Sequence, residues 1–386
     1  MLKILVVFGT RPEAIKLAPV IRRFQADPQQ CAVRVVVTAQ HRGLLDQALE
    51  AFSIVPDHDL NVMQPGQTLF ASTSRILAAL EPVFAMERPD FVLVQGDTTT
   101  TLCGALGAFY AGVPVGHVEA GLRTGDFAQP FPEEMNRVVA SRLAALHFAP
   151  TPRAAENLRG EGVAEDRIIV TGNTGIDAVL ETRHALEQGR LRAEGLPELD
   201  PRKKLILVTA HRRESFGPGF AEICAALARL AARPDVEIVY PVHPNPNVRE
   251  VVFRELGQLA SVRLSEPLAY VPFVELMRRA HLLLTDSGGI QEEAPSLGKP
   301  VLVMRDKTER PEAVTAGTAR LTGTDPQKIV AEAEILLDDA AEYSRRSHIH
   351  NPYGDGHASR RIQAAIYSFF GNTSPERSAT AAGPVV

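Results

Sequence analysis

The chain lacks the sequence features that mark nucleic-acid-binding, disulfide-bonded and membrane-spanning proteins. It has 386 residues, a formal net charge of −5 and no run of Lys and Arg that would form a basic stripe, so a nucleic-acid partner is not indicated. Its three cysteines, Cys31, Cys103 and Cys224, have no metal or redox spacing and fit reduced thiols. No apolar stretch approaches the ~20 residues of a membrane span, and residues 3–8 indicate a strand rather than an export signal. We therefore expect a cytoplasmic protein with no membrane partner.

Two nucleotide-binding motifs are also missing. No G-x-G-x-x-G follows the first predicted strand, which disfavours an NAD domain, and no G-x-x-x-x-G-K-[ST] predicts a P-loop. His348 and His350 lie near His357, but no set of well-spaced metal ligands accompanies them. The sequence therefore predicts no metal and no cofactor.

The fold class predicted is α/β, with two Rossmann-like doubly wound parallel sheets. Short β-branched runs alternate with longer amphipathic segments, as in parallel strands joined by helices. The strands of the first series are expected at residues 3–8, 33–38, 91–95, 113–117 and 146–149, and those of the second at 205–209, 237–240, 262–264, 282–285 and 301–304.

The length exceeds what one core usually supports, so we expect two domains. The predicted bounds are 1–172 for the first domain and 173–354 for the second, with the crossing in a segment that carries several Gly and Pro residues. A helix at about 355–370 is expected to pack back onto the first domain. Residues 371–386 have little to bury and are predicted to be a disordered tail.

The segment 284–304 is the most informative one in the chain. A buried strand runs into Ser287, Gly288 and Gly289, whose backbone N–H groups could close on an anion at the start of the next helix. Glu293 lies one helical turn further on, where a carboxylate could accept hydrogen bonds from ribose hydroxyls. The combination predicts a nucleotide diphosphate ligand.

Two basic residues follow the first strand. Arg11 stands at the carboxyl end of that strand, where open α/β sheets bind ligands. Lys16 lies five residues further, and its flexible side chain could reach the same anion. The alternative is that both are solvated residues of a turn and a helix.

Four carboxylates could supply acid and base groups. Asp97 and Glu119 follow neighbouring strands, and Glu133 and Glu134 open a helix after Pro132. Asp97 could instead cap a turn, and the two glutamates could simply complement a helix dipole. Carboxylates that lie together push their pKa values apart, which lets one act as acid and another as base.

The second domain offers a further set of polar candidates. His211 ends the first strand of this domain, and His243 lies in a loop stiffened by three prolines. Arg310, ranked above Arg305, follows the predicted strand at residues 301–304 and could meet the diphosphate or the substrate.

Seven motifs, taken together and in order, resemble those of the bacterial non-hydrolysing UDP-N-acetylglucosamine (UDP-GlcNAc) 2-epimerases. The motifs are Gly9-Thr-Arg-Pro-Glu13, Gly96-Asp-Thr-Thr-Thr100, His117-Val-Glu-Ala-Gly-Leu-Arg123, Pro132-Glu-Glu-Met-Asn-Arg137, Thr171-Gly-Asn-Thr174, His211-Arg-Arg-Glu214 and Asp286-Ser-Gly-Gly-Ile-Gln-Glu-Glu-Ala-Pro295. The resemblance runs from about residue 3 to residue 366.

The resemblance implies a glycosyltransferase-B-type fold with the active site in the inter-domain cleft, and a homodimer. It implies reversible conversion of UDP-GlcNAc to UDP-ManNAc, by elimination of UDP to 2-acetamidoglucal and re-addition with inversion at C-2. The product would supply ManNAc units for cell-surface polysaccharide, and no redox cofactor is needed.

The resemblance also assigns roles to residues. Asp97, Glu119 and Glu133 match catalytic carboxylates, and His211 matches a histidine near the sugar and diphosphate. The positions that hold the nucleotide sugar are Arg11, Lys16, Phe273, Ser287, Gly288, Gly289, Glu293 and Arg310, with Phe273 at the uracil. A second, activating UDP-GlcNAc site has the candidates Gln40, Glu134, Arg212 and His243, although Gly43 and Gly66 replace larger residues of some members.

The same sequence features also fit other functions. A UDP-sugar glycosyltransferase of the same architecture would keep the phosphate cradle and Glu293 but need an acceptor site. A hydrolysing relative would release free ManNAc. A non-catalytic nucleotide-sugar sensor would bind UDP-GlcNAc and be indifferent to Asp97→Asn.

Overall fold

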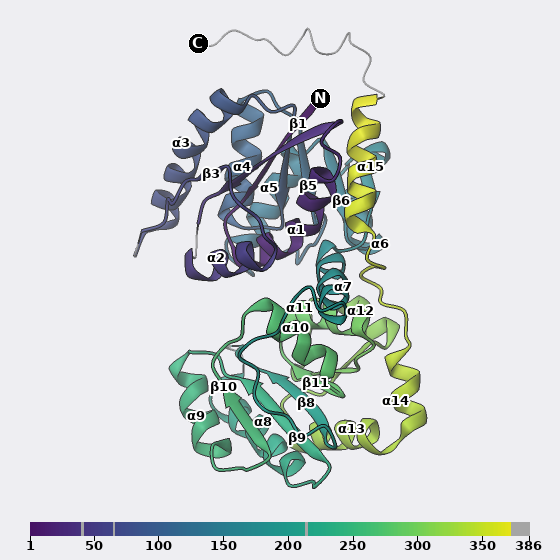
Figure 1. The fold of residues 1–386 in the computed structure, drawn as a ribbon. Helices are drawn as coiled ribbons and strands as arrows, with labels where there is room; N and C mark the ends of the chain where they lie inside the picture. Colours follow the sequence, from purple (N-terminus) through teal and green to yellow (C-terminus); the bar gives the residue numbers. More distant parts are fainter. Residues whose placement is uncertain (40–41, 65, 213–214, 372–386) are drawn as a thin grey trace. The chain divides into compact units, whose positions relative to one another are not determined.

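The computed structural model describes residues 1–39, 42–64, 66–212 and 215–371, shown as a ribbon in Figure 1. The chain divides into two compact units. Unit 1 consists of Met1–Ala178 and the chain from Gly354 onward, and unit 2 consists of Val179–Tyr353. The first division falls inside helix α7 (Thr174–Glu187). All of the predicted tail beyond residue 371 lies outside the described residues.

Unit 1 contains a seven-stranded parallel sheet of order β3-β2-β1-β4-β5-β6-β7. Its strands are β1 Leu2–Phe8, β2 Cys31–Val37, β3 His58–Asp59, β4 Phe91–Gln95, β5 Val115–Val118, β6 Leu146–Ala149 and β7 Ile168–Val170. The five-strand prediction missed β3 and β7. Both are edge strands of two or three residues, too short to show a hydrophobic period.

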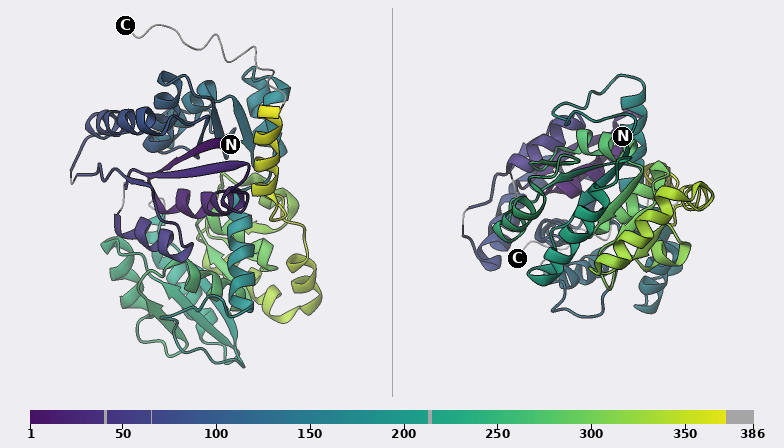
Figure 2. Two further views of the ribbon diagram at one scale, coloured as in Figure 1. Left: turned by 45° about the horizontal axis from the view of Figure 1, so that its top comes forward. Right: turned by 90° about the horizontal axis from the view of Figure 1, so that it is seen from below.

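Helices cover both faces of this sheet, as Figure 2 shows from a second direction. Leu5 and Val7 of β1 face a core formed with the third and fourth helices. The helices of unit 1 are α1 Arg11–Gln25, α2 Arg42–Ala51, α3 Leu69–Glu87, α4 Thr99–Tyr110, α5 Glu133–Leu143, α6 Pro152–Gly160, the start of α7 and α15 Ala358–Gly371. Because both faces are buried, β1 and β4 are apolar almost throughout.

Helix α3 is long and apolar enough to cross a membrane by length and composition alone. Arg75 and Glu81 interrupt the apolar run of α3, which is why the sequence shows no uninterrupted apolar stretch of that length. Length and composition are weak evidence, since the core helix of a globular unit meets the same criteria. Ile76, Leu80, Val83 and Phe84 of α3 are indeed buried in the core.

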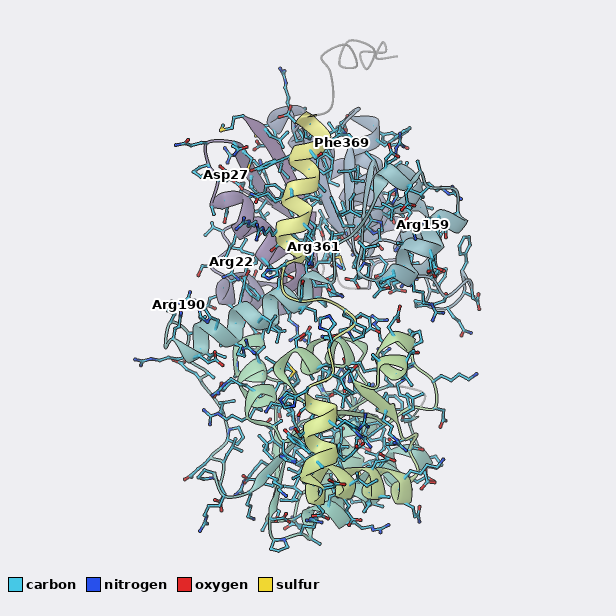
Figure 3. All side chains as sticks on the ribbon, turned by 90° about the vertical axis from the view of Figure 1, so that its right-hand side faces the viewer. Arg22, Asp27, Arg159, Arg190, Arg361 and Phe369 are labelled. Atoms are coloured by element: carbon cyan, nitrogen blue, oxygen red, sulfur yellow. The ribbon has the colours of Figure 1, made fainter. Side chains whose placement is uncertain are left out.

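Helix α15 packs on unit 1 although it lies far from the rest of that unit in sequence. The Oγ and backbone N–H of Ser359 both donate to the buried Asp177 carboxylate, at 2.7 and 2.8 Å. Figure 3 shows Arg361 and Phe369 near opposite ends of the helix, and the Phe369 ring contacts Phe91 of β4 with centroids 6.0 Å apart.

Unit 2 contains a six-stranded parallel sheet of order β10-β9-β8-β11-β12-β13. Its strands are β8 Lys204–Thr209, β9 Val236–Pro241, β10 Val262–Ser265, β11 Leu282–Thr285, β12 Val301–Val303 and β13 Ala319–Leu321. Its helices are the remainder of α7, α8 Pro218–Ala231, α9 Pro246–Leu256, α10 Tyr270–Arg279, α11 Gly288–Glu293, α12 Pro311–Ala316, α13 Pro326–Asp338 and α14 Ala340–Ser347. The short edge strand β13 is the one that the sequence did not predict.

The strand orders confirm the predicted fold class, because each sheet is parallel and doubly wound. In each sheet the order reverses once, between β1 and β4 in unit 1 and between β8 and β11 in unit 2. Open α/β sheets bind ligands outside the carboxyl ends of the two strands at such a reversal. Asp97 follows β4 and His211 follows β8, so both lie at these points.

Candidate active site

Asp97 is held by two neighbours at the carboxyl end of β4. Its side chain forms an ion pair with the Arg137 guanidinium of α5, and its backbone carbonyl accepts a hydrogen bond from Asn136 Nδ2 at 2.8 Å. The preceding Gly96 has a φ of +74°, which a glycine adopts without strain. These contacts fix the direction in which the Asp97 carboxylate points.

Glu119 lies at the neighbouring strand end, directly after β5. Its φ of +65° is rare for a residue with a side chain and is typical of strained functional sites. Oε2 of Glu119 accepts hydrogen bonds from Lys16 Nζ and from Gln95 Nε2, both at 2.5 Å. The Lys16 and Glu119 side chains are only 16% and 8% exposed, so this is a largely buried ion pair.

The structure brings Asp97 and Glu119 within electrostatic reach of each other. Burial raises the pKa of Asp97, the charge of Arg137 opposes the rise, and the charge of Glu119 adds to it. A raised pKa makes a carboxylate a stronger base and, once protonated, a usable acid near neutral pH. Asp97, beside Glu119 at the switch point of unit 1, therefore has a property that proton transfer requires.

His117 positions the turn that carries Asp97. Its buried Nε2 donates a hydrogen bond to the Gly96 carbonyl at 2.7 Å, and burial lowers its pKa to about 4. His117 is therefore neutral at neutral pH, and it contributes a hydrogen bond without adding positive charge beside the carboxylates.

Glu13 is an important residue that the sequence reading did not assign. One oxygen accepts the backbone N–H groups of Gly9 and Thr10, at 3.0 and 2.7 Å, and the other accepts the hydroxyls of Thr98 and Thr101, at 2.7 and 3.3 Å. It thereby connects the loop after β1 with the loop after β4. The capping-box spacing from Thr10 to Glu13 was the signal that could have found it.

Glu133 and Glu134 occupy the first turn of α5, as predicted from the sequence. Glu134 is buried, and its Oε1 accepts the backbone N–H groups of Thr124 and Gly125 at 3.0 and 2.9 Å, while Oε2 lies 3.2 Å from Arg137 Nη1. Glu134 thus holds the loop before α5. Glu133 is partly exposed, and its catalytic role stays a prediction.

In unit 2 the corresponding switch point carries His211 and a buried acid, Asp286. Oδ2 of Asp286 accepts the backbone N–H groups of His211 and Arg212 at 2.6 and 2.7 Å. Oδ1 lies 3.4 Å from Nδ1 of the His211 ring. The His243 ring stacks on the His211 ring, and the two ring centroids lie 5.2 Å apart. Asp286 was not among the predicted site residues.

The residues predicted to form a diphosphate cradle lie close together in unit 2. A Cβ atom on Gly288 would lie 3.5 Å from the Arg310 guanidinium, so that cation lies over the glycine turn. A Cβ atom on Gly289 would lie 3.9 Å from Glu293 Oε1 and 4.0 Å from Ser287 Oγ. Ser287, both glycines, Glu293 and Arg310 therefore form one cluster, in which Arg310 is paired with the buried Glu292.

For the remaining predicted residues, the structure gives the position in the fold but does not test the role. Arg11 begins α1 and Phe273 lies in α10, both partly buried. Arg212 contributes its backbone N–H to Asp286. Gln40, proposed for an activating site, lies outside the described residues. The binding roles of these residues stay predictions.

Across 1–39, 42–64, 66–212 and 215–371 no group of three or more His, Cys, Asp or Glu side chains is placed to hold a metal ion.

Comparison with known proteins identifies the family. A family model described as UDP-N-acetylglucosamine 2-epimerase matches residues 22–367. The chain belongs to the UDP-N-acetylglucosamine 2-epimerase family. The UDP-N-acetylglucosamine 2-epimerase of Escherichia coli K12 is 60% identical over 370 residues, which cover 95% of this chain and 98% of that protein. The resemblance inferred from the seven motifs is confirmed.

Solved structures of family members share the fold. The UDP-GlcNAc 2-epimerase of Neisseria meningitidis, solved bound to UDP-GlcNAc, is 47% identical, with a TM-score of 0.87, and the match covers 95% of this chain and all of that one. The glycotransferase of kitacinnamycin, at 16% identity, has a TM-score of 0.62 over 95% of this chain and 98% of that chain. The second likeness shows only that the two-sheet architecture is of the glycosyltransferase-B type.

Proposed function

We propose that this family member interconverts UDP-GlcNAc and UDP-ManNAc without net hydrolysis. A base removes the proton from C-2 of the sugar while the bond from C-1 to the UDP oxygen breaks, giving 2-acetamidoglucal and UDP. UDP then adds back at C-1 while an acid protonates C-2 on the other face. Family membership over most of the chain supports the reaction, and the Asp97–Glu119 pair is the observation that carries it.

Asp97 and Glu119 are proposed to handle the C-2 proton, with Glu133 as the third carboxylate. Support comes from the electrostatic link between Asp97 and Glu119 and from the cations that each of them contacts, Arg137 and Lys16. Because Arg137 and Lys16 hold the carboxylates in place, little reorganisation is needed when a proton moves.

The nucleotide diphosphate is proposed to bind in unit 2, on Ser287, Gly288 and Gly289. Arg310 over the glycine turn would meet phosphate oxygens with charge-assisted hydrogen bonds. Glu293 beside Gly289 would accept from the ribose hydroxyls, and His211 would assist departure of the diphosphate. Phe273 would line the uracil pocket.

The proposal is tested by incubating the purified protein with UDP-GlcNAc in deuterated water. We expect UDP-ManNAc to form and one deuterium to enter C-2 of both nucleotide sugars, since the carbon is deprotonated and reprotonated. Absence of both signals would refute the reaction. Release of free ManNAc would favour a hydrolase instead, and transfer to an added acceptor without epimerisation would favour a glycosyltransferase.

We further propose a cytoplasmic homodimer that supplies ManNAc units for a cell-surface polysaccharide. Free, buried Cys31, Cys103 and Cys224 support a reducing compartment. Sedimentation equilibrium at micromolar concentration should give twice the chain mass of 41.9 kDa, and a single-chain mass would contradict the dimer. Deletion of the gene should deplete the ManNAc-containing polymer.

A second UDP-GlcNAc site is proposed to activate the enzyme, with Gln40, Glu134, Arg212 and His243 as its contacts. The buried position of Glu134 against the loop at Thr124 gives that residue a way to influence the loop before α5. Starting from UDP-ManNAc alone, we expect a lag that a trace of UDP-GlcNAc removes. A reverse reaction with no lag would contradict the activation.

A further inference from the structure

The site of unit 2 contains a buried acid, Asp286, beside His211. Asp286 directly follows β11 and its side chain is fully buried. An ionised carboxylate in such a place is strongly disfavoured unless hydrogen bonds or charges compensate it. Two backbone N–H groups, from His211 and Arg212, compensate one of its oxygens.

The other oxygen of Asp286 is directed at the histidine ring. Oδ1 accepts no hydrogen bond from the residues that the structure describes, and it lies 3.4 Å from Nδ1 of His211. A small rotation of the imidazole would close this gap into a hydrogen bond. The His211 ring is 37% exposed, so one edge of it remains accessible while Nδ1 faces the buried acid.

We propose that Asp286 is the positioning residue of His211, holding the proton on Nδ1 so that Nε2 is directed at the departing diphosphate and is stabilised as N–H⁺ when it donates. This inference rests on the proposed function for the identity of the acceptor. A carboxylate behind a histidine acts in this way in serine hydrolases, where it orients the ring and stabilises the imidazolium.

The surroundings explain why such an acid is needed. Burial lowers the pKa of His211, and the charges of Arg212 and the stacked His243 lower it further, whereas Asp286 raises it. His243 accepts the backbone N–H of Asn245 on its own Nδ1 at 3.1 Å. Without Asp286, burial, Arg212 and His243 would therefore all disfavour the protonated ring that donates to a phosphate.

The variant Asp286→Asn separates this role from a structural one. The amide oxygen can still accept the N–H groups of His211 and Arg212, so the local backbone is retained. The amide NH₂ then faces Nδ1 and can only donate, which forces the histidine proton onto Nε2 in the neutral ring. The matched control is Asp177→Asn, since Asp177 is a buried acid of unit 1 that also accepts two backbone N–H groups.

The direct test is ¹⁵N NMR of histidine-labelled full-length protein, with His211 assigned from the signals missing in His211→Gln. We expect the proton of neutral His211 on Nδ1 in the wild type and in Asp177→Asn, and on Nε2 in Asp286→Asn. A wild-type ring protonated on Nε2 would overturn the proposal even if Asp286→Asn failed to fold, and so would an unchanged tautomer in the variant.

Kinetics supply the second readout. In Asp286→Asn we expect kcat to fall by about 10²-fold or more, with KM for UDP-GlcNAc little changed, and the alkaline limb of kcat to move to lower pH because the acid no longer raises the His211 pKa. A rise in KM with kcat unchanged would overturn the proposal, and so would an alkaline limb of kcat at the same pH as in the wild type. If the wild type made no UDP-ManNAc, the proposed function would fail while the NMR result would still decide the role of Asp286.

Discussion

Lys16 of α1 and Glu119 after β5 form an ion pair with Nζ 2.5 Å from Oε2, across a separation of 103 residues in sequence. The pair spans the point where the strand order of unit 1 reverses. Gln95, at the end of β4, donates to the same oxygen. A single carboxylate oxygen after β5 therefore contacts both the helix that follows β1 and the last residue of β4.

Substitution Lys16→Met should destabilise the protein and impair catalysis together. Removing the cation of a largely buried pair leaves the Glu119 charge without its Lys16 partner, although Gln95 still donates to it, and we expect the free energy of unfolding in urea titrations to fall by about 3 kcal/mol. The control is Lys3→Met, since Lys3 is 35% exposed and lies 3.5 Å from Glu87, and its loss should cost less than about 1 kcal/mol. Equal effects of the two variants would argue against burial as the cause.

Asp97→Asn should abolish most of the epimerisation while leaving binding intact. Loss of a proton-transfer group reduces kcat by ~10²–10⁴, and calorimetry should show UDP-GlcNAc binding close to that of the wild type. Asp90→Asn is a matched control, because Asp90 lies exposed beside the amino end of the same strand β4. Full activity in Asp97→Asn would favour a sensor over an enzyme.

Arg310→Gln should weaken binding of UDP and UDP-GlcNAc by about tenfold or more, since a charge-assisted hydrogen bond contributes roughly 1.5–3 kcal/mol. Titration calorimetry with UDP alone measures the effect on the nucleotide. Arg320→Gln serves as the control, because Arg320 is 57% exposed and pairs with Glu332 on the surface of the same unit. Unchanged affinity for UDP in Arg310→Gln would remove Arg310 from the cradle.

His117 should make the fold sensitive to acid. Its folded pKa is lowered to about 4, below the ordinary value of about 6.5, so the unfolded chain binds the proton first as pH falls. The stabilisation is therefore complete above about pH 6.5 and is lost as pH falls toward 4, by about 3 kcal/mol at most. Urea unfolding of His117→Gln at several pH values should show a flatter slope over this window, and an identical slope would contradict the assignment.

Gly121→Ala should be one of the most destabilising single changes in unit 1. Gly121 has a φ of +90°, and an added Cβ would lie 2.2 Å from the backbone oxygen of Ala154, so strain and overlap combine to about 3 kcal/mol or more. Gly160→Ala in α6 is the control, since nothing lies within 4 Å of its added Cβ. Thermal unfolding of the two variants measures the contrast, and a wild-type midpoint for Gly121→Ala would show that the loop can move.

Residues that act through the backbone were the hardest to predict. Glu13 and Asp286 each lie in a quoted motif, yet neither was assigned a role, because each also accepts hydrogen bonds from a segment distant in sequence, at Thr98 and at His211 respectively. Arg137 was likewise only part of a motif until the structure placed it between Asp97 and Glu134. Spacing along a chain shows what ends a strand, but not which neighbour satisfies a buried charge.

The sequence by itself determined the parallel α/β class, the family and the strand ends at which Asp97, Glu119 and His211 lie. These depend on local hydrophobic patterns and on glycine turns, which are properties of short stretches of the sequence. Only the tertiary structure decided the pairing of Glu119 with Lys16 and of His211 with Asp286, and the edge strands β3, β7 and β13. Those features arise from contacts between segments far apart in the chain, where burial makes the choice of each polar partner energetically decisive.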